Sequence, residues 1–336
     1  MCGIVGYIGQ NEAYPVLIAG LKKLEYRGYD SAGVALVNRQ DKLNVYKTKG
    51  KVANLEELAA DKDCEGHIGI AHTRWATHGE PSADNAHPHV SMSGDLALVH
   101  NGIIENYQVL KEQLIDRGYQ FKSSTDTEVL VQLIDSYYQQ NGKDLVSAVC
   151  QSLNDVVGAY AIAVIECKNP DHIVAARQSS PLVVGVAKDN KDFYIASDAT
   201  PIVEYTDKVV YLEDGQIADI RLGQDLEIIN LNHKSCTYAI KTVDLDISKL
   251  SKGGFDHFML KEIFDQPQCL KDCMSGRLFV DQENPLNNHI VLSALTEYKE
   301  RLMAAKHIII VACGTSWHAG LIGKQLIEKM CRKRVD

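Results

Sequence analysis

The sequence lacks the features that would direct the protein to a membrane or to nucleic acid. Its 336 residues include no apolar run near the ~18 residues that a membrane helix requires. Thirty-five Lys and Arg stand against 44 Asp and Glu, which gives a net charge of −9 and no positive field that would attract phosphate backbones. We therefore expect neither a membrane nor a nucleic acid as a partner.

The cysteines lack the pattern of a disulfide-bonded protein. They number nine, an odd count, and include no CxxC pair. The first residues, Met-Cys-Gly-Ile-Val-Gly, carry neither a basic leader nor an apolar segment ahead of Cys2, and position 2 is not the Gly that myristoylation needs. A reducing, cytoplasmic location is therefore expected, without a secretory signal or a lipoprotein-type cysteine.

No repeat, low-complexity segment or long linker interrupts the chain up to about residue 240. Closely spaced segments rich in Val, Ile and Tyr lie between residues 159 and 220 with no helix between them, which favours antiparallel sheets with helices packed outside. The sequence therefore predicts an α+β fold. Strands are predicted over residues 3–9, 33–37, 43–48, 67–73, 95–100, 159–166, 172–177, 183–187, 193–196, 208–212 and 216–220.

Helices are indicated where Leu, Ile and Val recur every three or four residues. Thr125 and Glu128 have the spacing of a capping box, which fixes where one of these helices begins and therefore where Asp126 points. The predicted helices of this part of the chain cover residues 14–26, 104–117, 126–140 and 144–153.

The pattern changes after about residue 240. A strand, a small polar turn and a helix follow one another near the end of the chain, an order typical of the start of a parallel α/β domain. The predictions here are helices over residues 258–274 and 293–305, a buried strand over 307–312, a turn over 313–316 and a helix from about 317 to 331.

The position of Cys2 suggests a chemistry that its residue type alone does not. Removal of Met1, expected because Cys is small, leaves one residue with both a thiol and a free α-amine. An α-amine titrates near ~7.8, against ~10.4 for lysine, so it can serve as general base for a thiol of ordinary pKa ~8.5. The alternative is that Cys2 is a small hydrophobic residue that opens an edge strand, and its neighbours must decide between the two.

Two polar segments supply further candidate groups. Residues 72–89 are too poor in aliphatic side chains to form core, and a long polar loop between strands usually serves a ligand. Within it Arg74 can bind a carboxylate through two parallel hydrogen bonds, although a surface ion pair is the simpler alternative. Asn101 and Gly102 form either a plain turn or an oxyanion hole, in which the Asn amide and the Gly N–H donate to one developing negative charge.

The histidines do not have the spacing of a metal site. They match neither HExxH nor paired Cys/His fingers, so structural histidines and loop contacts account for them better. We expect no metal and no cofactor. The residues in question are His72, His78, His87, His89 and His100.

Five segments together resemble the class II glutamine amidotransferases, whose nucleophile is the N-terminal residue. They are Met-Cys-Gly-Ile-Val-Gly, Glu-Tyr-Arg-Gly-Tyr-Asp-Ser-Ala-Gly at 25–33, His-Thr-Arg-Trp-Ala-Thr-His-Gly-Glu-Pro at 72–81, Val-His-Asn-Gly-Ile-Ile-Glu at 99–105 and Ser-Thr-Asp-Thr-Glu at 124–128. Within that class, residues 254–267 and 311–319 are similar to the isomerising glutamine:fructose-6-phosphate aminotransferases. The resemblance implies a four-layer αββα N-terminal-nucleophile hydrolase sandwich, followed by the truncated start of an α/β sugar-isomerase domain.

The resemblance also implies a role for each candidate residue. Cys2 is the expected nucleophile with its own α-amine as base, and Asn101 and Gly102 hold the oxyanion. Arg74 is expected to bind the α-carboxylate of glutamine and Asp126 its α-ammonium. The remaining expected site residues are Arg27, which helps to position the N-terminal residue; Trp75, Thr77, His78 and His87, in a loop that closes over glutamine; and Cys313, Gly314, Thr315 and Ser316, which match the family's first sugar-phosphate loop.

The resemblance further predicts the domains and the reaction. We expect a glutaminase domain over residues 2–240, a linker and helical segment over 241–305, and an incomplete strand, loop and helix of a sugar-isomerase domain over 306–336. L-Glutamine is hydrolysed to glutamate and ammonia through a thioester. In the parent family this ammonia converts fructose 6-phosphate to glucosamine 6-phosphate, which is expected here only if the missing isomerase part is supplied. Residues 241–336 are expected to pack weakly or to stay exposed.

Several alternatives stay open at this point. The chain could be another class II amidotransferase, of the phosphoribosyl-diphosphate or asparagine type, or a catalytically silent binding or regulatory remnant. Its assembly is also open, between a homodimer and association with the rest of a synthase.

Overall fold

The computed structural model describes residues 2–75, 80–187, 190–243, 254–274, 277–279, 284–290, 295 and 298–336. The chain divides into two compact units, Met1–Gly253 and Gly254–Asp336. Among the described residues no helix is both long enough and apolar enough to span a membrane.

The larger sheet of the first unit has eight antiparallel strands in the order β14-β11-β9-β10-β1-β4-β2-β3. Its central pair, β1 (Gly3–Ile8) and β4 (Ile68–Arg74), has a register that joins Gly3 to Thr73, so the next position along places Cys2 beside Arg74. The other strands are β2 (Ser31–Val37), β3 (Leu43–Lys49), β9 (Val183–Val186), β10 (Phe193–Ala196), β11 (Lys208–Tyr211) and β14 (Lys241–Thr242).

The smaller sheet has six antiparallel strands in the order β13-β12-β8-β7-β6-β5. Its central ladder joins β6 (Leu96–Ile104) to β7 (Gly158–Glu166) along their full lengths, with Asn101 opposite Ala161 and Gly102 opposite Tyr160. The pair Asn101 and Gly102 therefore belongs to a strand and not to a free turn. The remaining strands are β5 (His89–Val90), β8 (His172–Gln178), β12 (Gln216–Arg221) and β13 (Glu227–Asn230).

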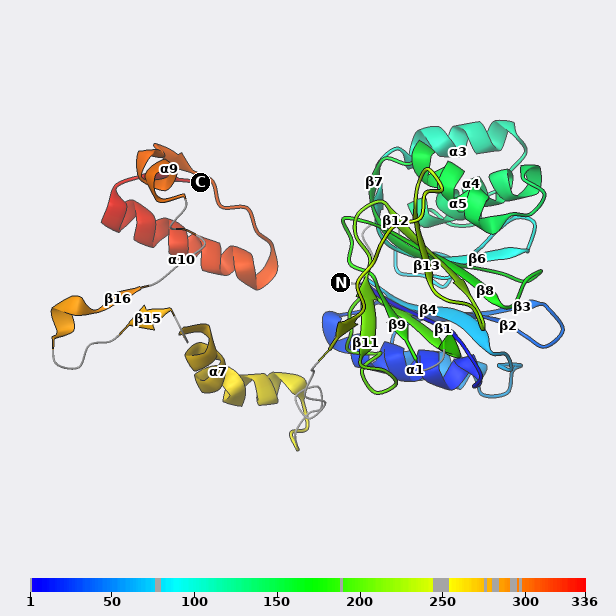
Figure 1. The fold of residues 1–336 in the computed structure, drawn as a ribbon, viewed down its shortest axis with the longest axis horizontal. Coiled ribbons are helices and arrows are strands. Elements are labelled where there is room, and N and C mark those ends of the chain that lie inside the picture. The colour runs from blue at the N-terminus through cyan, green and yellow to red at the C-terminus, as the bar shows by residue number, and fades with distance from the viewer. Residues whose placement is uncertain are drawn as a thin grey trace. The chain divides into compact units, whose positions relative to one another are not determined.

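Helices cover the outer face of each sheet, which gives the unit four layers (Figure 1). Side chains of a strand alternate between its two faces. Ile4 and Ile8 of β1 therefore lie in the core between the sheets, whereas Val5 and Tyr7 lie in the core under the helices. The predicted αββα sandwich is confirmed. Its helices are α1 (Ala13–Leu24) and α2 (Val52–Ala59) on the larger sheet, and α3 (Tyr107–Asp116), α4 (Asp126–Gln140) and α5 (Leu145–Asp155) on the smaller.

The second unit has little core of its own. Among its described hydrophobic side chains only Val335 is buried. Its elements are α7 (Phe258–Met274), β15 (Leu278–Phe279), η3 (Pro285–Asn287), β16 (His289–Ile290), α9 (Lys299–Ala304), β17 (His307–Ile308), α10 (Gly314–Cys331) and β18 (Arg334–Val335).

The prediction of a buried strand over residues 307–312 is wrong. Strand β17 ends at Ile308, and the side chains of Ile309 and Val311 are 67% and 89% exposed. A parallel strand is buried only when neighbours flank it, and within the described residues β17 pairs with β18 alone. The turn predicted over residues 313–316 also differs. Cys313 is the N-cap of α10, and the next three residues form its first turn, where backbone N–H groups need no intrahelical acceptor.

Candidate active site

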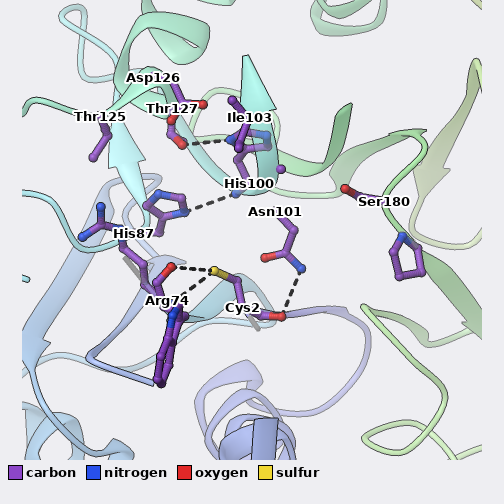
Figure 2. Close-up of a pocket in the computed structure, with 13 residues that line it drawn as sticks. Cys2, Arg74, His87, His100, Asn101, Ile103, Thr125, Asp126, Thr127 and Ser180 are labelled. Carbon is purple, nitrogen blue, oxygen red and sulfur yellow. Dashed lines mark hydrogen bonds between the residues drawn. The ribbon is translucent and has the colours of Figure 1, made fainter. Parts of the chain in front are cut away.

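A cavity of about 410 Å³ lies between the start of β1, the end of β4, the second half of β6 and the start of α4. Strands of both sheets therefore supply its walls, and Figure 2 shows the residues that line it. They are Cys2, Arg74, Trp75, His87, His100, Asn101, Gly102, Ile103, Thr125, Asp126, Thr127, Ser180 and Pro181.

The Cys2 thiol faces the cavity from the residue before β1. Its Sγ accepts a hydrogen bond from the Trp75 backbone N–H at 3.2 Å and donates to the Trp75 carbonyl at 3.5 Å. Burial raises the pKa of this thiol, while the Trp75 N–H and the Arg74 guanidinium act in the opposite direction. Because burial prevails, the sulfur is a thiol near neutral pH and needs a base before it can attack.

The Asn101 side chain lies beside the Cys2 backbone (Figure 2). Its amide Nδ2 donates to the Cys2 carbonyl at 3.4 Å and to Ser197 Oγ at 3.0 Å. Ser197 Oγ also accepts the Ile4 N–H at 2.6 Å, which links the amide to strand β1. An amide donor is thus held next to the sulfur-bearing residue, where the oxyanion of an acyl-transfer intermediate would form.

Gly102 occupies a position that only glycine fits. Its φ is +138°, and a Cβ there would lie 1.9 Å from the Ala159 carbonyl oxygen across the β6–β7 ladder. The missing side chain lets the two strands stay paired while the Gly102 backbone lines the cavity.

Two side chains of opposite charge line the same cavity. Arg74 is 4% exposed at the end of β4, and its Nη1 reaches the Glu80 carbonyl at 3.5 Å. Asp126 is 6% exposed at the first position of α4, and its Oδ2 accepts the Ile104 N–H at 2.8 Å. A cation and an anion fixed in one cavity suit a ligand that carries both an ammonium and a carboxylate.

The start of α4 fixes the position of Asp126. Thr125 is the N-cap, and its Oγ1 accepts the Glu128 N–H at 3.3 Å, as the sequence predicts. The Glu128 carboxylate accepts the backbone N–H groups of Lys122 at 2.9 Å and Ser123 at 2.6 Å, earlier in the chain than a capping box requires. The segment before α4 is therefore hydrogen-bonded to the first turn of this helix.

Four buried histidines surround the site. His72 stacks on His87 with ring centroids 4.3 Å apart, and His87 packs edge-on against His89 at 5.0 Å. Burial lowers the pKa of His72 to about 3 and holds those of His87, His89 and His100 below the ordinary value, so these rings are neutral near pH 7. Among the described residues no three His, Cys, Asp or Glu side chains form a metal-binding group.

The structure brings most of the residues predicted for the glutamine site together. Cys2, Arg74, Trp75, His87, Asn101, Gly102 and Asp126 all line the one cavity. Thr77, His78 and the side chain of Arg27 lie outside the described residues. Cys313, Gly314, Thr315 and Ser316 belong to the second unit, at the start of α10.

Sequence reasoning missed several groups around the cavity. Ser180 and Pro181 line it from the segment between β8 and β9, and Ser197 hydrogen-bonds Asn101 from the residue after β10. No motif marks these three, because strand pairing brings them to the cavity from far along the chain. Thr127 adjoins the predicted Asp126, and its Oγ1 lies 2.9 Å from His100 Nδ1, so a helix starting at residue 126 could have suggested it.

Comparison with known proteins decides the family. The profile of the glutamine amidotransferase domain matches residues 58–224. A curated glutamine--fructose-6-phosphate aminotransferase [isomerizing] of Bacteroides thetaiotaomicron is 62% identical over all 336 residues, which cover 54% of its length. The protein of the same name from Chlorobaculum tepidum is 50% identical over 340 residues, again across 54% of its length. This chain belongs to the class II glutamine amidotransferases.

Solved amidotransferase structures agree with this assignment. The glutamine phosphoribosylpyrophosphate amidotransferase of B. subtilis superposes with a TM-score of 0.57 and 28% identity, across 70% of this chain and 50% of that one. A structure described as the allosteric regulatory enzyme of purine biosynthesis gives the same TM-score with 29% identity, across 68% of this chain and 49% of that one. The chain spans about half the length of the curated amidotransferases it matches.

Proposed function

We propose that the first unit hydrolyses L-glutamine to glutamate and ammonia, with Cys2 as nucleophile. The observation that supports this most is the shared cavity, in which a thiol, an amide donor and two opposite charges face one another. A γ-amide substrate needs the first two for acyl transfer, and an α-amino acid needs the last two for recognition.

The proposed reaction has two steps. Cys2 Sγ attacks the side-chain amide carbon of glutamine, and the negative charge on the carbonyl oxygen is stabilised by Asn101 Nδ2 and the Gly102 N–H. The C–N bond then breaks, and the leaving nitrogen takes up the proton that the thiol gave to the base, so that ammonia departs from a γ-glutamyl thioester. Water attacks the thioester, the C–S bond breaks, and glutamate and the free thiol are released.

The proposed binding mode places each end of glutamine on one buried charge. Arg74 holds the α-carboxylate through paired N–H groups, and Asp126 accepts the α-ammonium. Trp75, Thr77, His78 and His87 are assigned to the segment over the substrate, and Arg27 to the positioning of the N-terminal residue.

The base in this proposal is the α-amine of Cys2, which requires removal of Met1. With Met1 in place the Cys2 nitrogen is an amide and has no basicity. As a free amine with a pKa of ~7.8 it is largely able to accept a proton near pH 8.

We further propose that this half-reaction serves a longer enzyme. The names of the relatives that match the whole chain, together with the residues 313–316 at the start of α10, support ammonia transfer to fructose 6-phosphate. The domain limits proposed for that enzyme are 2–240, 241–305 and 306–336. The isomerising step depends on residues beyond those present here.

The test is glutamate release by the whole chain, with the N-terminus identified by mass spectrometry. The wild-type protein with Cys2 exposed is expected to hydrolyse glutamine. Cys2→Ala is expected to abolish hydrolysis while glutamine still binds, because Arg74 and Asp126 are intact. Normal hydrolysis by Cys2→Ala would refute the nucleophile, and a processed wild-type protein that binds glutamine without forming glutamate would favour the silent remnant.

A further inference from the structure

The amide of Asn101 is held at both of its ends. Its Oδ1 lies 2.9 Å from Nε2 of His72, a residue of β4 in the larger sheet, whereas Asn101 itself belongs to β6 in the smaller sheet. Its Nδ2 faces the other way, toward the Cys2 carbonyl and Ser197 Oγ. The orientation of this amide decides whether a donor or an acceptor faces the sulfur.

We propose that His72 is a positioning residue for the oxyanion hole, whose Nε2–H fixes the Asn101 amide so that Nδ2 points to the reaction site. This rests on the proposed glutamine hydrolysis, which it deepens by one residue. No motif suggests the role, because His72 does not line the cavity and acts only through Asn101.

The chemistry of the contact defines the protonation of His72. A carbonyl oxygen only accepts, so the ring nitrogen that faces Asn101 Oδ1 must carry a hydrogen. The other ring nitrogen, Nδ1, is buried with no hydrogen-bond partner among the described residues, where a second N–H would be costly. Burial also keeps the ring neutral, with a pKa of about 3. The Nε2–H tautomer is therefore the one that the surroundings favour.

Rotating the amide by 180° shows what this tautomer excludes. Asn101 Nδ2 would then face the Nε2–H of His72, donor against donor, and Oδ1 would face the Cys2 carbonyl, acceptor against acceptor. The oxyanion would meet a carbonyl oxygen instead of an N–H. Without the His72 donor, only the bond from Nδ2 to Ser197 Oγ and the weaker one to the Cys2 carbonyl would oppose this rotation.

The two hydrogen bonds that Asn101 Nδ2 donates also differ in strength. The bond to Ser197 Oγ is 3.0 Å long, which is ordinary, and the bond to the Cys2 carbonyl is 3.4 Å long, which is weak. The second hydrogen can therefore turn to an oxyanion at little cost. His72 and Ser197 hold the amide in place while it does so.

The stacking of His72 on His87 makes its position rigid. The two rings lie 26° from parallel, and His72 is fully buried in the middle of the larger sheet, opposite Ile4 on one side and Gly33 on the other. A ring so enclosed holds Nε2 at a constant place relative to β6.

The test compares His72→Phe with His72→Gln in the whole chain with Cys2 exposed. Phe fills the space without a donor and is expected to lower kcat by about 10- to 100-fold, less than the 10²- to 10³-fold typical for loss of an oxyanion donor. KM should change less than about threefold, because Arg74 and Asp126 bind the substrate. Gln keeps an N–H near the position of Nε2 and should recover most of kcat.

Two further measurements separate positioning from a general loss of structure. Alkylation of Cys2 by iodoacetamide, followed by peptide mass spectrometry, forms no oxyanion and should proceed at the wild-type rate in His72→Phe. In the Asn101→Ala background the Phe substitution should cause no further loss of kcat, because His72 acts only through that amide. If Phe prevents folding, His72→Met supports the same comparisons, since its flexible side chain fills the space without a donor.

His172→Gln is the matched control. It removes a buried histidine of β8 that is bonded through both ring nitrogens but does not line the cavity, and it should leave kcat unchanged. Wild-type kcat in His72→Phe, failure of Gln to recover kcat, or a further loss in the Asn101→Ala background would each overturn the role of His72. If the wild-type protein itself releases no glutamate, it is the proposed function that fails.

Discussion

Substitution of Gly102 by alanine tests whether the backbone at the β6–β7 ladder controls both stability and catalysis. The added Cβ would lie 1.9 Å from the Ala159 carbonyl oxygen and 2.9 Å from His100 Nε2, whereas real Cβ atoms essentially never come closer than 3.0 Å. The two strands would have to separate by roughly 1 Å, which is enough to weaken the hydrogen bonds beside the new side chain. The positive φ adds strain that glycine avoids.

These two effects give the expected magnitude. The backbone strain costs about 1–2 kcal/mol and the overpacking about 1–3 kcal/mol, so the free energy of unfolding should fall by about 2–5 kcal/mol. For a unit of this size that corresponds to a fall in melting temperature of about 4–20 °C. A shift of roughly 1 Å in the Gly102 N–H should also lower kcat about 100-fold or more.

Gly118→Ala supplies the control for this measurement. Gly118 also has a positive φ, +91°, but a Cβ there meets nothing within 4 Å. It should lose only the 1–2 kcal/mol of backbone strain and keep its kcat. Thermal unfolding and glutamate release are measured for both variants. If Gly102→Ala and Gly118→Ala lose equal stability and Gly102→Ala keeps the wild-type kcat, the close approach of β6 and β7 at Gly102 does not control stability or catalysis.

Two other predictions concern charged groups. Arg74→Lys should raise KM for glutamine about 10-fold or more with little change in kcat, because an ammonium cannot form the paired bonds of a guanidinium; an unchanged KM would contradict the binding mode. Burial lowers the pKa of His172, but the hydrogen bonds that its ring N–H groups donate to Asp219 and Glu166 outweigh burial and raise the pKa above its ordinary value. The stability this ring contributes is therefore complete below about pH 6.5 and lost as the pH rises through the folded pKa. The difference in unfolding free energy between wild type and His172→Gln should shrink from pH 6 to pH 9. A difference that stays constant over this range would refute the stabilising role of the protonated His172 ring.

Short apolar runs between turn residues predicted most strands of the first unit, because each sheet is buried on both faces, one in the core between the sheets and one under helices. Three- and four-residue spacing predicted most of its helices. It missed α2, although Val52, Leu55 and Ala59 have helical spacing and are buried. Eight residues are too few for the pattern to stand out, and the N-cap Lys51 forms no side-chain cap. The predicted helix over 104–117 begins later, at Tyr107, because β6 continues to Ile104 to pair with Gly158.

Some residues of the candidate site could be predicted from local motifs, whereas others depend on how strands far apart in the sequence pair. Residues within continuous motifs, such as Arg74 and Asn101, could be predicted because the resemblance attaches a role to each letter. Ser180 and Ser197 could not, since they reach the cavity only through the order in which distant strands pair. His72 was expected to be a structural histidine, and the 2.9 Å contact with Asn101 is what suggests its proposed role in the oxyanion hole.

The electrostatics of the cavity leave the α-amine of Cys2 as the best-matched base. Burial raises the pKa of the thiol from an ordinary value of about 8.5, while the neighbouring His72 ring has a pKa of about 3, a gap of more than about five units. The lining histidines, His87 and His100, are held neutral by the same burial and are also weak bases. An α-amine near ~7.8 lies above the lowered pKa of each of these rings, so proton transfer from the same thiol to it is less uphill than transfer to any of them. The burial that raises the pKa of the thiol also makes the imidazoles poor bases, so we expect that exposure of the Cys2 nitrogen is the step that activates the proposed glutaminase.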